Sequence, residues 1–350
     1  MTLNELLEKT VLQNASDLHL TVGTEPILRI NGELIKVGEA KLTTVDTEKY
    51  VRELLGNLYD EYEEKGEMDT SLSLPGVGRF RVNAYKQRGS HAVAIRSVAL
   101  KVPTLAELKL PTVVKELTQK KRGLVLVTGP TGSGKSTTLA AMINEINTSR
   151  SAHIITLEDP VEFLHKHNKS IINQREIGRD TLSYQAALRA ALREDPDVIF
   201  VGEMRDLETI SIAITAAETG HLVLSTLHTI GAAKTIDRII DVFTPHQQQQ
   251  IKVQLATVLQ GIISQQLIPK NDGKGRAGAY ELMIINSAIQ NLIREGKTHQ
   301  IQSSIQTGSK YGMKTMDMSL VELYKTGAIS YESALTYSID RDMVKRMIDL

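Results

Sequence analysis

One glycine-rich segment constrains the fold of this chain more than any other feature. Its nine consecutive residues are Gly129, Pro130, Thr131, Gly132, Ser133, Gly134, Lys135, Ser136 and Thr137. The segment follows an apolar run at residues 124–128 and precedes a helical pattern, which is the strand–loop–helix setting of a phosphate-binding P-loop. In that setting the glycines let the backbone wrap around phosphates, and the helix N-terminus presents amide groups to the anion. We therefore expect ATP here, with Lys135 reaching its β- and γ-phosphates and Ser136 ligating Mg²⁺.

Short apolar runs alternate with helical patterns around this loop. The runs cover residues 124–128, 154–157, 198–201 and 222–226. Continuous apolar runs are typical of parallel strands that are covered on both faces. Helices expected at residues 135–147, 184–193 and 207–218 provide the crossovers between them. After residue 246 the pattern predicts helices, apart from a hairpin-like stretch at 277–285. The fold class expected is α/β.

The first hundred residues have a different pattern. Helices are expected at residues 4–13 and 47–65, and strands at 18–20, 27–30, 78–86 and 91–98, with a hairpin turn at Asn31–Gly32. These elements predict a small α+β domain with an antiparallel sheet. The chain has 350 residues, and single cores rarely grow beyond about 250–300. Two prolines within residues 101–111 indicate a hinge, so we expect domains at 1–105 and 106–350.

Composition excludes several classes of function. Lys+Arg and Asp+Glu number 41 each, so no overall positive field attracts nucleic acid. Aromatic residues make up only 4%, which leaves few stacking platforms for bases. Without Cys, thiolate zinc sites and disulfides are excluded. No apolar stretch approaches the roughly 18–20 residues of a membrane span. We expect a cytoplasmic protein, peripheral to the membrane at most, that does not bind nucleic acid.

Three side chains follow the expected parallel strands and are candidates for catalysis. Glu203 ends the strand at 198–201, where a P-loop protein needs a carboxylate for Mg²⁺. Glu158 follows the strand at 154–157 and is a candidate base for the attacking water. His228 follows the strand at 222–226 and is a candidate sensor of the γ-phosphate. Asp197, at the opposite end of its strand, is expected to be a cap or loop residue.

Four segments in order resemble the motifs of the secretion-ATPase superfamily. Residues 129–137, 155–162, 195–206 and 224–229 are similar to its Walker A, Asp box, Walker B and His box. That superfamily contains the motors of type II and type IV secretion and of type IV pili. The resemblance implies a PAS-like N-terminal domain joined to a RecA-like ATPase domain. It also implies a homo-hexamer with ATP between neighbouring subunits.

Residues 288–295, with the sequence AIQNLIRE, resemble the AIRNLIRE signature of retraction motors, with Gln290 in place of Arg. Extension and type II secretion motors typically carry a tetracysteine motif and an extra domain, so the absence of Cys disfavours them. The resemblance implies a hexameric ATPase motor that powers type IV pilus retraction and twitching motility. It also implies a PilC-like platform protein in the inner membrane as partner, and peripheral membrane association through it. An accessory retraction motor is the close alternative. The same segment is also an amphipathic helix that buries Ile289, Leu292 and Ile293.

Arginines in the first domain are the last candidates. Arg79, Arg81, Arg88 and Arg96 lie on or between the two long expected strands. In the superfamily, arginines of this region approach the nucleotide at a subunit boundary, in the manner of an arginine finger. Arg81 and Arg96 are preferred, although a solvated face explains four arginines equally well. The stretch His165, Lys166 and His167 is expected to be a polar loop and not a metal site.

Two functions from other classes remain as alternatives. A GTP-dependent switch needs a guanine-reading Asn-Lys-x-Asp motif, and the nearest match, residues 168–171, lacks the Asp. A RecA-like motor that translocates nucleic acid needs a basic stripe with interleaved aromatics, which the sequence does not contain.

Overall fold

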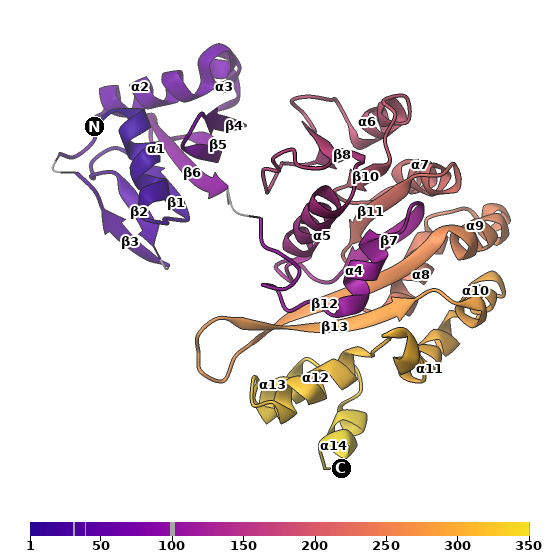
Figure 1. Ribbon diagram of the computed structural model, residues 1–350. Helices are drawn as coiled ribbons and strands as arrows, with labels where there is room; N and C mark the ends of the chain where they lie inside the picture. The colour runs from indigo at the N-terminus through magenta and orange to yellow at the C-terminus, as the bar shows by residue number, and fades with distance from the viewer. Residues whose placement is uncertain (31, 39, 99–101, 350) are drawn as a thin grey trace. The chain divides into compact units, whose positions relative to one another are not determined.

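The computed structural model describes residues 1–30, 32–38, 40–98 and 102–349. The described chain divides into two compact units, and each has its own sheet (Figure 1). The first unit comprises residues 1–98 and Glu162–Leu164, and the second comprises 102–161 and 165–349. Of the segment expected to be a hinge, Lys101 lies outside the described residues, and 102–111 contain neither helix nor strand.

The first unit is built on a six-stranded antiparallel sheet in the order β3-β2-β1-β6-β5-β4. Its strands are β1 (Asp17–Leu20), β2 (Ile27–Ile30), β3 (Glu33–Lys36), β4 (Glu67–Leu74), β5 (Gly78–Gln87) and β6 (Ser90–Val98). Burial alternates along β5, where Phe80, Val82 and Ala84 are buried and Arg81 is exposed. This period of two places one face of the sheet on the core and leaves the other face to solvent.

Three α-helices complete the first unit: α1 (Leu3–Leu12), α2 (Thr44–Leu55) and α3 (Tyr59–Lys65). The single helix expected over residues 47–65 is wrong. The chain forms α2, a short 3₁₀ helix η1 (Gly56–Leu58) and then α3, because Gly56 adopts a φ of +53° that ends α2. Asn31, half of the expected hairpin turn, lies outside the described residues, but β2 and β3 pair on either side of it.

The second unit contains a seven-stranded sheet in the order β13-β12-β7-β11-β10-β8-β9. The strands are β7 (Gly123–Thr128), β8 (His153–Glu158), β9 (Ile171–Glu176), β10 (Val198–Val201), β11 (Leu222–Leu227), β12 (Leu259–Pro269) and β13 (Arg276–Ile284). All neighbours pair in parallel except β12 and β13, which form an antiparallel hairpin. Parallel pairing brings the carboxyl ends of β7, β8, β10 and β11 to one edge of the sheet.

Helices cover both faces of this sheet. On one face, α4 (Thr112–Thr118) and α5 (Lys135–Ser149) pack on Val125 and Val127 of β7. On the other face, α6 (Tyr184–Ala191), α7 (Leu207–Glu218), α8 (Ala232–Asp241) and α9 (Pro245–Val258) share a core with Leu124 and Leu126. Successive residues of β7 therefore belong to different cores, which is why the strand is a continuous apolar run. The α/β fold class expected from the sequence is confirmed.

β12 corrects the expectation that the chain is helical between residue 246 and the stretch at 277–285. Leu259–Pro269 is a strand that pairs in parallel with β7 and antiparallel with β13. The segment mixes apolar residues with Gln260, Ser264, Gln265 and Gln266, so its pattern does not separate a helix from a strand, and the pairing with β7 decides between them. The strand β9 was also not expected, because only its first two residues, Ile171 and Ile172, are apolar.

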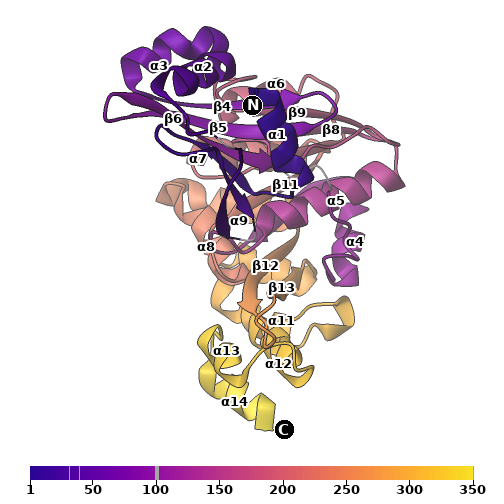
Figure 2. The ribbon, with the colours of Figure 1, turned by 90° about the vertical axis from the view of Figure 1, so that its left-hand side faces the viewer.

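The chain ends in a helical region: α10 (Ser287–Arg294), η2 (Thr298–Gln300), α11 (Ile301–Gln306), η3 (Ser309–Tyr311), α12 (Met316–Lys325), α13 (Tyr331–Thr336) and α14 (Arg341–Asp349). Figures 1 and 2 show α12, α13 and α14 gathered beside the β12–β13 hairpin. A small core of its own, which includes Ile268, Ala279 and Leu320, joins them to that hairpin. Among the described residues, no helix is both long and apolar enough to cross a membrane.

Candidate active site

The P-loop connects β7 to α5 at the carboxyl edge of the sheet. Three of its glycines have positive φ, +142° at Gly129, +78° at Gly132 and +88° at Gly134, which favours glycine over other residues. Space is a further constraint at Gly129, because a Cβ there would lie 2.3 Å from the carbonyl oxygen of Gln265. The close approach of β12 therefore requires a glycine at this position.

Gln265 of β12 holds the loop from the side. Its Nε2 donates to the carbonyl of Ser133 at 2.6 Å, and its Oε1 accepts from the hydroxyl of Thr138 at 2.9 Å. The side chain is 2% exposed, so both hydrogen bonds are shielded from water. The sequence analysis missed this residue because it interpreted β12 as a helix. Its partners Thr138 and Ser133 lie 127 and 132 residues away in the sequence, so no local pattern indicates these contacts.

Lys135 lies against the backbone of the loop. Lys135, the first residue of α5, donates to the carbonyls of Gly129 and Pro130 at 2.9 and 3.0 Å, which places its ammonium over the loop. Ser136 and Thr137 follow in the first turn of α5, where helix amides favour an anion. The buried hydroxyl of Ser133 has no hydrogen-bond partner within the described residues.

Glu203 and His228 lie side by side at the ends of adjacent strands β10 and β11. Glu203 Oε2 lies 3.5 Å from His228 Nε2 and 2.6 Å from Arg205 Nε. The carboxylate is 15% exposed and the other two side chains are more than half exposed. A hydrogen bond of 3.2 Å from the amide of Met204 to the carbonyl of Thr226 holds the two strand ends together. The structure thus brings together two of the three predicted side chains, and it adds Arg205.

A cavity of about 490 Å³ opens beside this pair. Its lining comes from the ends of β10 and β11 and from α7 and α8, and includes Glu203, Arg205, Thr226, His228 and Arg238. Two arginines and a histidine around one carboxylate make this cavity suited to an anionic group.

Glu158 ends β8 and is 8% exposed. Its Oε1 accepts from the hydroxyl of Thr156 at 2.6 Å and from Nε2 of Gln174 at 3.1 Å. Gln174 lies in β9, so the strand that was not expected supplies one of its donors. A carboxylate fixed by two donors in a nearly dry site is well placed to orient a water molecule.

The hydroxyl of Tyr184 in α6 lies near Gly202, where the paired strands β8 and β10 end. A Cβ at Gly202 would lie 2.8 Å from Oη of Tyr184 and 3.1 Å from the carbonyl of Leu157, so glycine allows the hydroxyl to approach. Burial, and next the charge of Glu203, raises the pKa of Tyr184, so its hydroxyl stays protonated and can donate. Sequence reasoning did not identify this residue, because it is the first residue of an ordinary amphipathic helix.

Asp197 and His167 accept hydrogen bonds from backbone amides. Asp197 accepts from the amide of His153 at 2.8 Å before β10 begins, as expected for a loop residue. Burial lowers the pKa of His165 to about 4, and the Nδ1 of His167 accepts from the amide of Ile172 at 3.1 Å. Among the described residues, no three His, Asp or Glu side chains gather closely enough to hold a metal ion. A P-loop Mg²⁺ needs only Ser136, Glu203 and phosphate oxygens, so the donor set fits that ion.

The preferred arginines lie in the first unit. Arg81 of β5 and Arg96 of β6 are both exposed, and Arg96 Nε lies 2.8 Å from Asp17 Oδ1. Arg79 donates to the hydroxyl of Ser71 at 2.9 Å, and Arg88 is in the β5–β6 turn with a φ of +48°. Arg79 and Arg96 are therefore both held by hydrogen-bond partners within the first unit.

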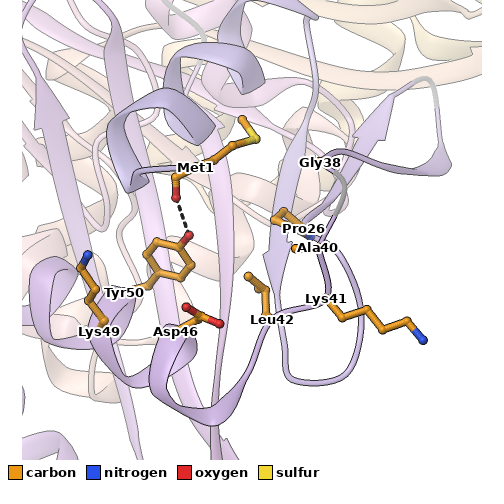
Figure 3. A pocket seen from close by; sticks show the side chains of 9 residues that line it. All are labelled: Met1, Pro26, Gly38, Ala40, Lys41, Leu42, Asp46, Lys49 and Tyr50. Atoms are coloured by element: carbon orange, nitrogen blue, oxygen red, sulfur yellow. Dashed lines mark hydrogen bonds between the residues drawn. The ribbon is translucent and has the colours of Figure 1, made fainter.

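The first unit also has a pocket of about 550 Å³, shown in Figure 3. It is lined by Met1, Pro26, Gly38, Ala40, Lys41, Leu42, Asp46, Lys49 and Tyr50. Tyr50 points toward Met1 and donates to its carbonyl at 2.7 Å, whereas the Lys41 side chain extends outward (Figure 3). No residue predicted from the sequence to act on nucleotide lines this pocket.

The sheet and its P-loop define an α/β protein of the P-loop ATPase type. The family model described as Type II/IV secretion system protein matches residues 1–332. The chain therefore belongs to this family, which confirms the resemblance to the secretion ATPases.

Individual relatives match over nearly the whole chain. The chain is 50% identical over 335 residues to the Type IV pilus retractation ATPase PilT of Pseudomonas aeruginosa, covering 95% of this chain and 97% of that protein. It is 39% identical over 351 residues to the Type IV pilus ATPase PilU of the same organism, covering 100% and 92%. It also matches the crystal structure of the pilus retraction motor PilT with bound ADP, with a TM-score of 0.92 and 51% identity over 99% of each chain.

Proposed function

We propose that this chain is a subunit of a hexameric ATPase motor that powers retraction of type IV pili. One observation carries the proposal: the P-loop, Glu158, Glu203 and His228 follow four strands of one sheet, in a chain half identical to a pilus retraction ATPase along 95% of its length. The 39% identity to PilU makes an accessory retraction motor the less favoured alternative.

Each side chain has a role in this proposal. Lys135 contacts the β- and γ-phosphates, and Ser136 and Glu203 hold Mg²⁺. Glu158 orients the attacking water, and His228, beside Glu203, responds to the γ-phosphate. The remaining P-loop residues cradle the phosphates with backbone amides. When bound there, Mg²⁺ would supply positive charge that offsets the negative charge developing on the phosphates.

Three further parts of the proposal concern assembly. Arg81 or Arg96 acts on a nucleotide held by a neighbouring subunit. Residues 1–105 form a PAS-like domain, and 106–350 form a RecA-like ATPase domain with its helical C-terminal region. The ring works at the cytoplasmic side of the inner membrane, held there by a PilC-like platform protein.

Hydrolysis by the purified chain tests the enzymatic part. We expect Mg²⁺-dependent turnover of ATP in preference to GTP, unchanged by added DNA. Lys135→Ala should lose nucleotide binding, because the phosphates lose their direct cation, whereas Glu203→Ala should bind ATP and hydrolyse it far more slowly. Loss of binding in both variants would contradict the separate roles. Turnover stimulated by DNA in a salt-dependent manner would favour a nucleic-acid motor instead.

A further inference from the structure

A buried carboxyl group outside the P-loop holds three separate helices together. Glu281 lies in β13 and is 0% exposed. Its Oε1 accepts from the amide of Ala232 at 2.8 Å, and its Oε2 lies 3.4 Å from both the amide of Met316 and Nε2 of Gln302. Ala232 is the first residue of α8, Met316 is the first of α12, and Gln302 lies in α11. One side chain therefore connects the starts of two helices and the body of a third.

The chemistry of this cluster suits an ionised carboxylate. All three partners are donors, and an ionised carboxylate is purely an acceptor. Helix N-termini carry partial positive charge, so two of them converging on one anion stabilise it. Burial raises the pKa of Glu281, as does the nearby Asp317, while the donors from Ala232, Gln302 and Met316 act in the opposite direction.

The helix α8 begins directly after the loop that carries His228. The amide of Gly231 donates to the hydroxyl of Ser264 at 2.9 Å, and Ser264 lies opposite Glu281 in the β12–β13 ladder. The amides of Gly231 and Ala232 are therefore held by two facing side chains. Thr229 is fixed as well, since its hydroxyl lies 2.7 Å from that of Thr235. The Ser264–Glu281 pair therefore anchors the chain three to four residues after His228.

The same hairpin contacts the P-loop. Gln265, the residue after Ser264, holds the carbonyl of Ser133. Consecutive residues of β12 point to opposite faces of the sheet, so one strand supports the P-loop on one face and the His228 loop on the other. Glu281 extends this support to the C-terminal helices.

We propose that Glu281 is a positioning residue for His228. The carboxyl group of Glu281 joins the loop after His228 to the C-terminal helices α11 and α12, so that this loop and these helices shift together. The activity arm of its test rests on the ATPase function proposed above. The hydrogen-exchange arm does not depend on activity.

The test compares Glu281→Gln with Asp317→Asn in the full chain. Asp317 is a matched control: it is 1% exposed, lies in the first turn of α12, and accepts from the amides of Ile339 and Asp340 at 2.7 and 3.0 Å. Both substitutions keep the shape of the side chain and turn one acceptor oxygen into a donor. Of these two side chains, Glu281 accepts from the first residue of α8, whereas Asp317 accepts from Ile339 and Asp340.

The first arm measures amide hydrogen exchange without nucleotide. We expect Glu281→Gln to speed exchange in residues 229–235 and in 315–318 together, whereas Asp317→Asn should leave 229–235 as in the wild type. Should Glu281→Gln fail to fold, Ser264→Ala replaces it and should speed exchange in 229–235. Wild-type protection of 229–235 in the folded variant would overturn the proposal.

The second arm measures ATP turnover at a temperature where both variants are folded. Misplacing a group by about 1 Å can cost on the order of a hundredfold in rate. We expect Glu281→Gln to lower kcat by about tenfold or more with the KM for ATP changed less than about twofold. Asp317→Asn should keep nearly wild-type kcat. Equal losses in both variants would show a merely structural role and overturn the proposal. A wild-type chain without turnover would instead refute the proposed function, and the exchange arm would still decide.

Discussion

Arg81 and Arg96 lie directly opposite each other in the antiparallel β5–β6 ladder. Opposite residues on antiparallel strands have Cβ atoms about 4.5–5.5 Å apart, so two like charges share one exposed face at a cost in stability. Asp17, the partner of Arg96 on its other side in β1, offsets part of that cost. Two adjacent arginines exposed to solvent are well suited to bind a phosphate of a nucleotide held by another subunit.

We predict that these arginines act in trans. Rings of Arg81→Ala or Arg96→Ala alone, and rings of Glu158→Gln alone, should be inactive. Mixed rings should recover part of the ATP turnover, because some sites combine an intact arginine with an intact glutamate. Arg52→Ala, which removes an exposed arginine of α2 paired with Glu48, should stay active by itself. If demonstrably mixed rings show no recovery, the arginines do not act across subunits.

We predict that Glu158→Gln lowers ATP turnover by about a hundredfold or more, the usual scale for a positioned base, without abolishing ATP binding. Glutamine keeps the size of the side chain and an oxygen that can accept from Thr156 and Gln174, but it removes the negative charge. The variant therefore tests the basicity of the Glu158 carboxylate and not its packing. Glu194→Gln, which alters an exposed carboxylate paired with Arg175, is the control. Single-turnover hydrolysis and ATP titration on the same samples give both quantities. Near-normal turnover would remove Glu158 from the mechanism.

We predict that Gly129→Ala abolishes nucleotide binding, because its Cβ would meet the Gln265 carbonyl at 2.3 Å and force the loop or β12 to move. Gly132→Ala is the control, because it introduces the strain of a left-handed alanine without a steric contact. Its φ is +78°, but nothing lies within 4 Å of the added Cβ. It should cost only the roughly 1–2 kcal/mol of a left-handed alanine and retain binding. Titration with labelled ATP distinguishes them, and equal binding by both variants would contradict the steric account.

The sequence predicts the phosphate edge of the sheet well, because its signals are local. The P-loop is contiguous, and Glu158, Glu203 and His228 each follow a continuous apolar run. Where two elements meet only through long-range pairing, local patterns fail. The segment that forms β12 was predicted to be a helix. The support that Gln265 gives to the P-loop was therefore not predicted.

Two other features show the same limit. The two strands that carry Arg81 and Arg96 were predicted, yet only their register shows that the side chains are opposite each other. Glu281 looks like one more polar residue in a strand. Its partners Ala232 and Met316 are 49 and 35 residues away, so its role follows only from the folded arrangement.

We predict that the polar face of α10 couples hydrolysis to pilus movement. Ile289 and Ile293 are fully buried and anchor this helix, with Leu292 half-buried beside them, whereas Arg294 and Glu295 are exposed. Changing Arg294 and Glu295 together to Ala should leave folding, ring assembly and ATPase rate intact and impair twitching motility. Ile293→Asp should instead destabilise the second unit by burying a charge. Normal motility with the double alanine change would leave α10 a structural helix only.

The most direct measurement of the central claim is imaging of labelled pili in living cells that lack this protein. We expect cells without it to extend pili that persist and do not retract. The wild-type chain should restore retraction, and Lys135→Ala, produced at the same level, should not. Loss of all pili in the deletion strain would contradict the account and indicate an extension motor, and normal retraction driven by Lys135→Ala would show that retraction does not depend on ATP at this P-loop.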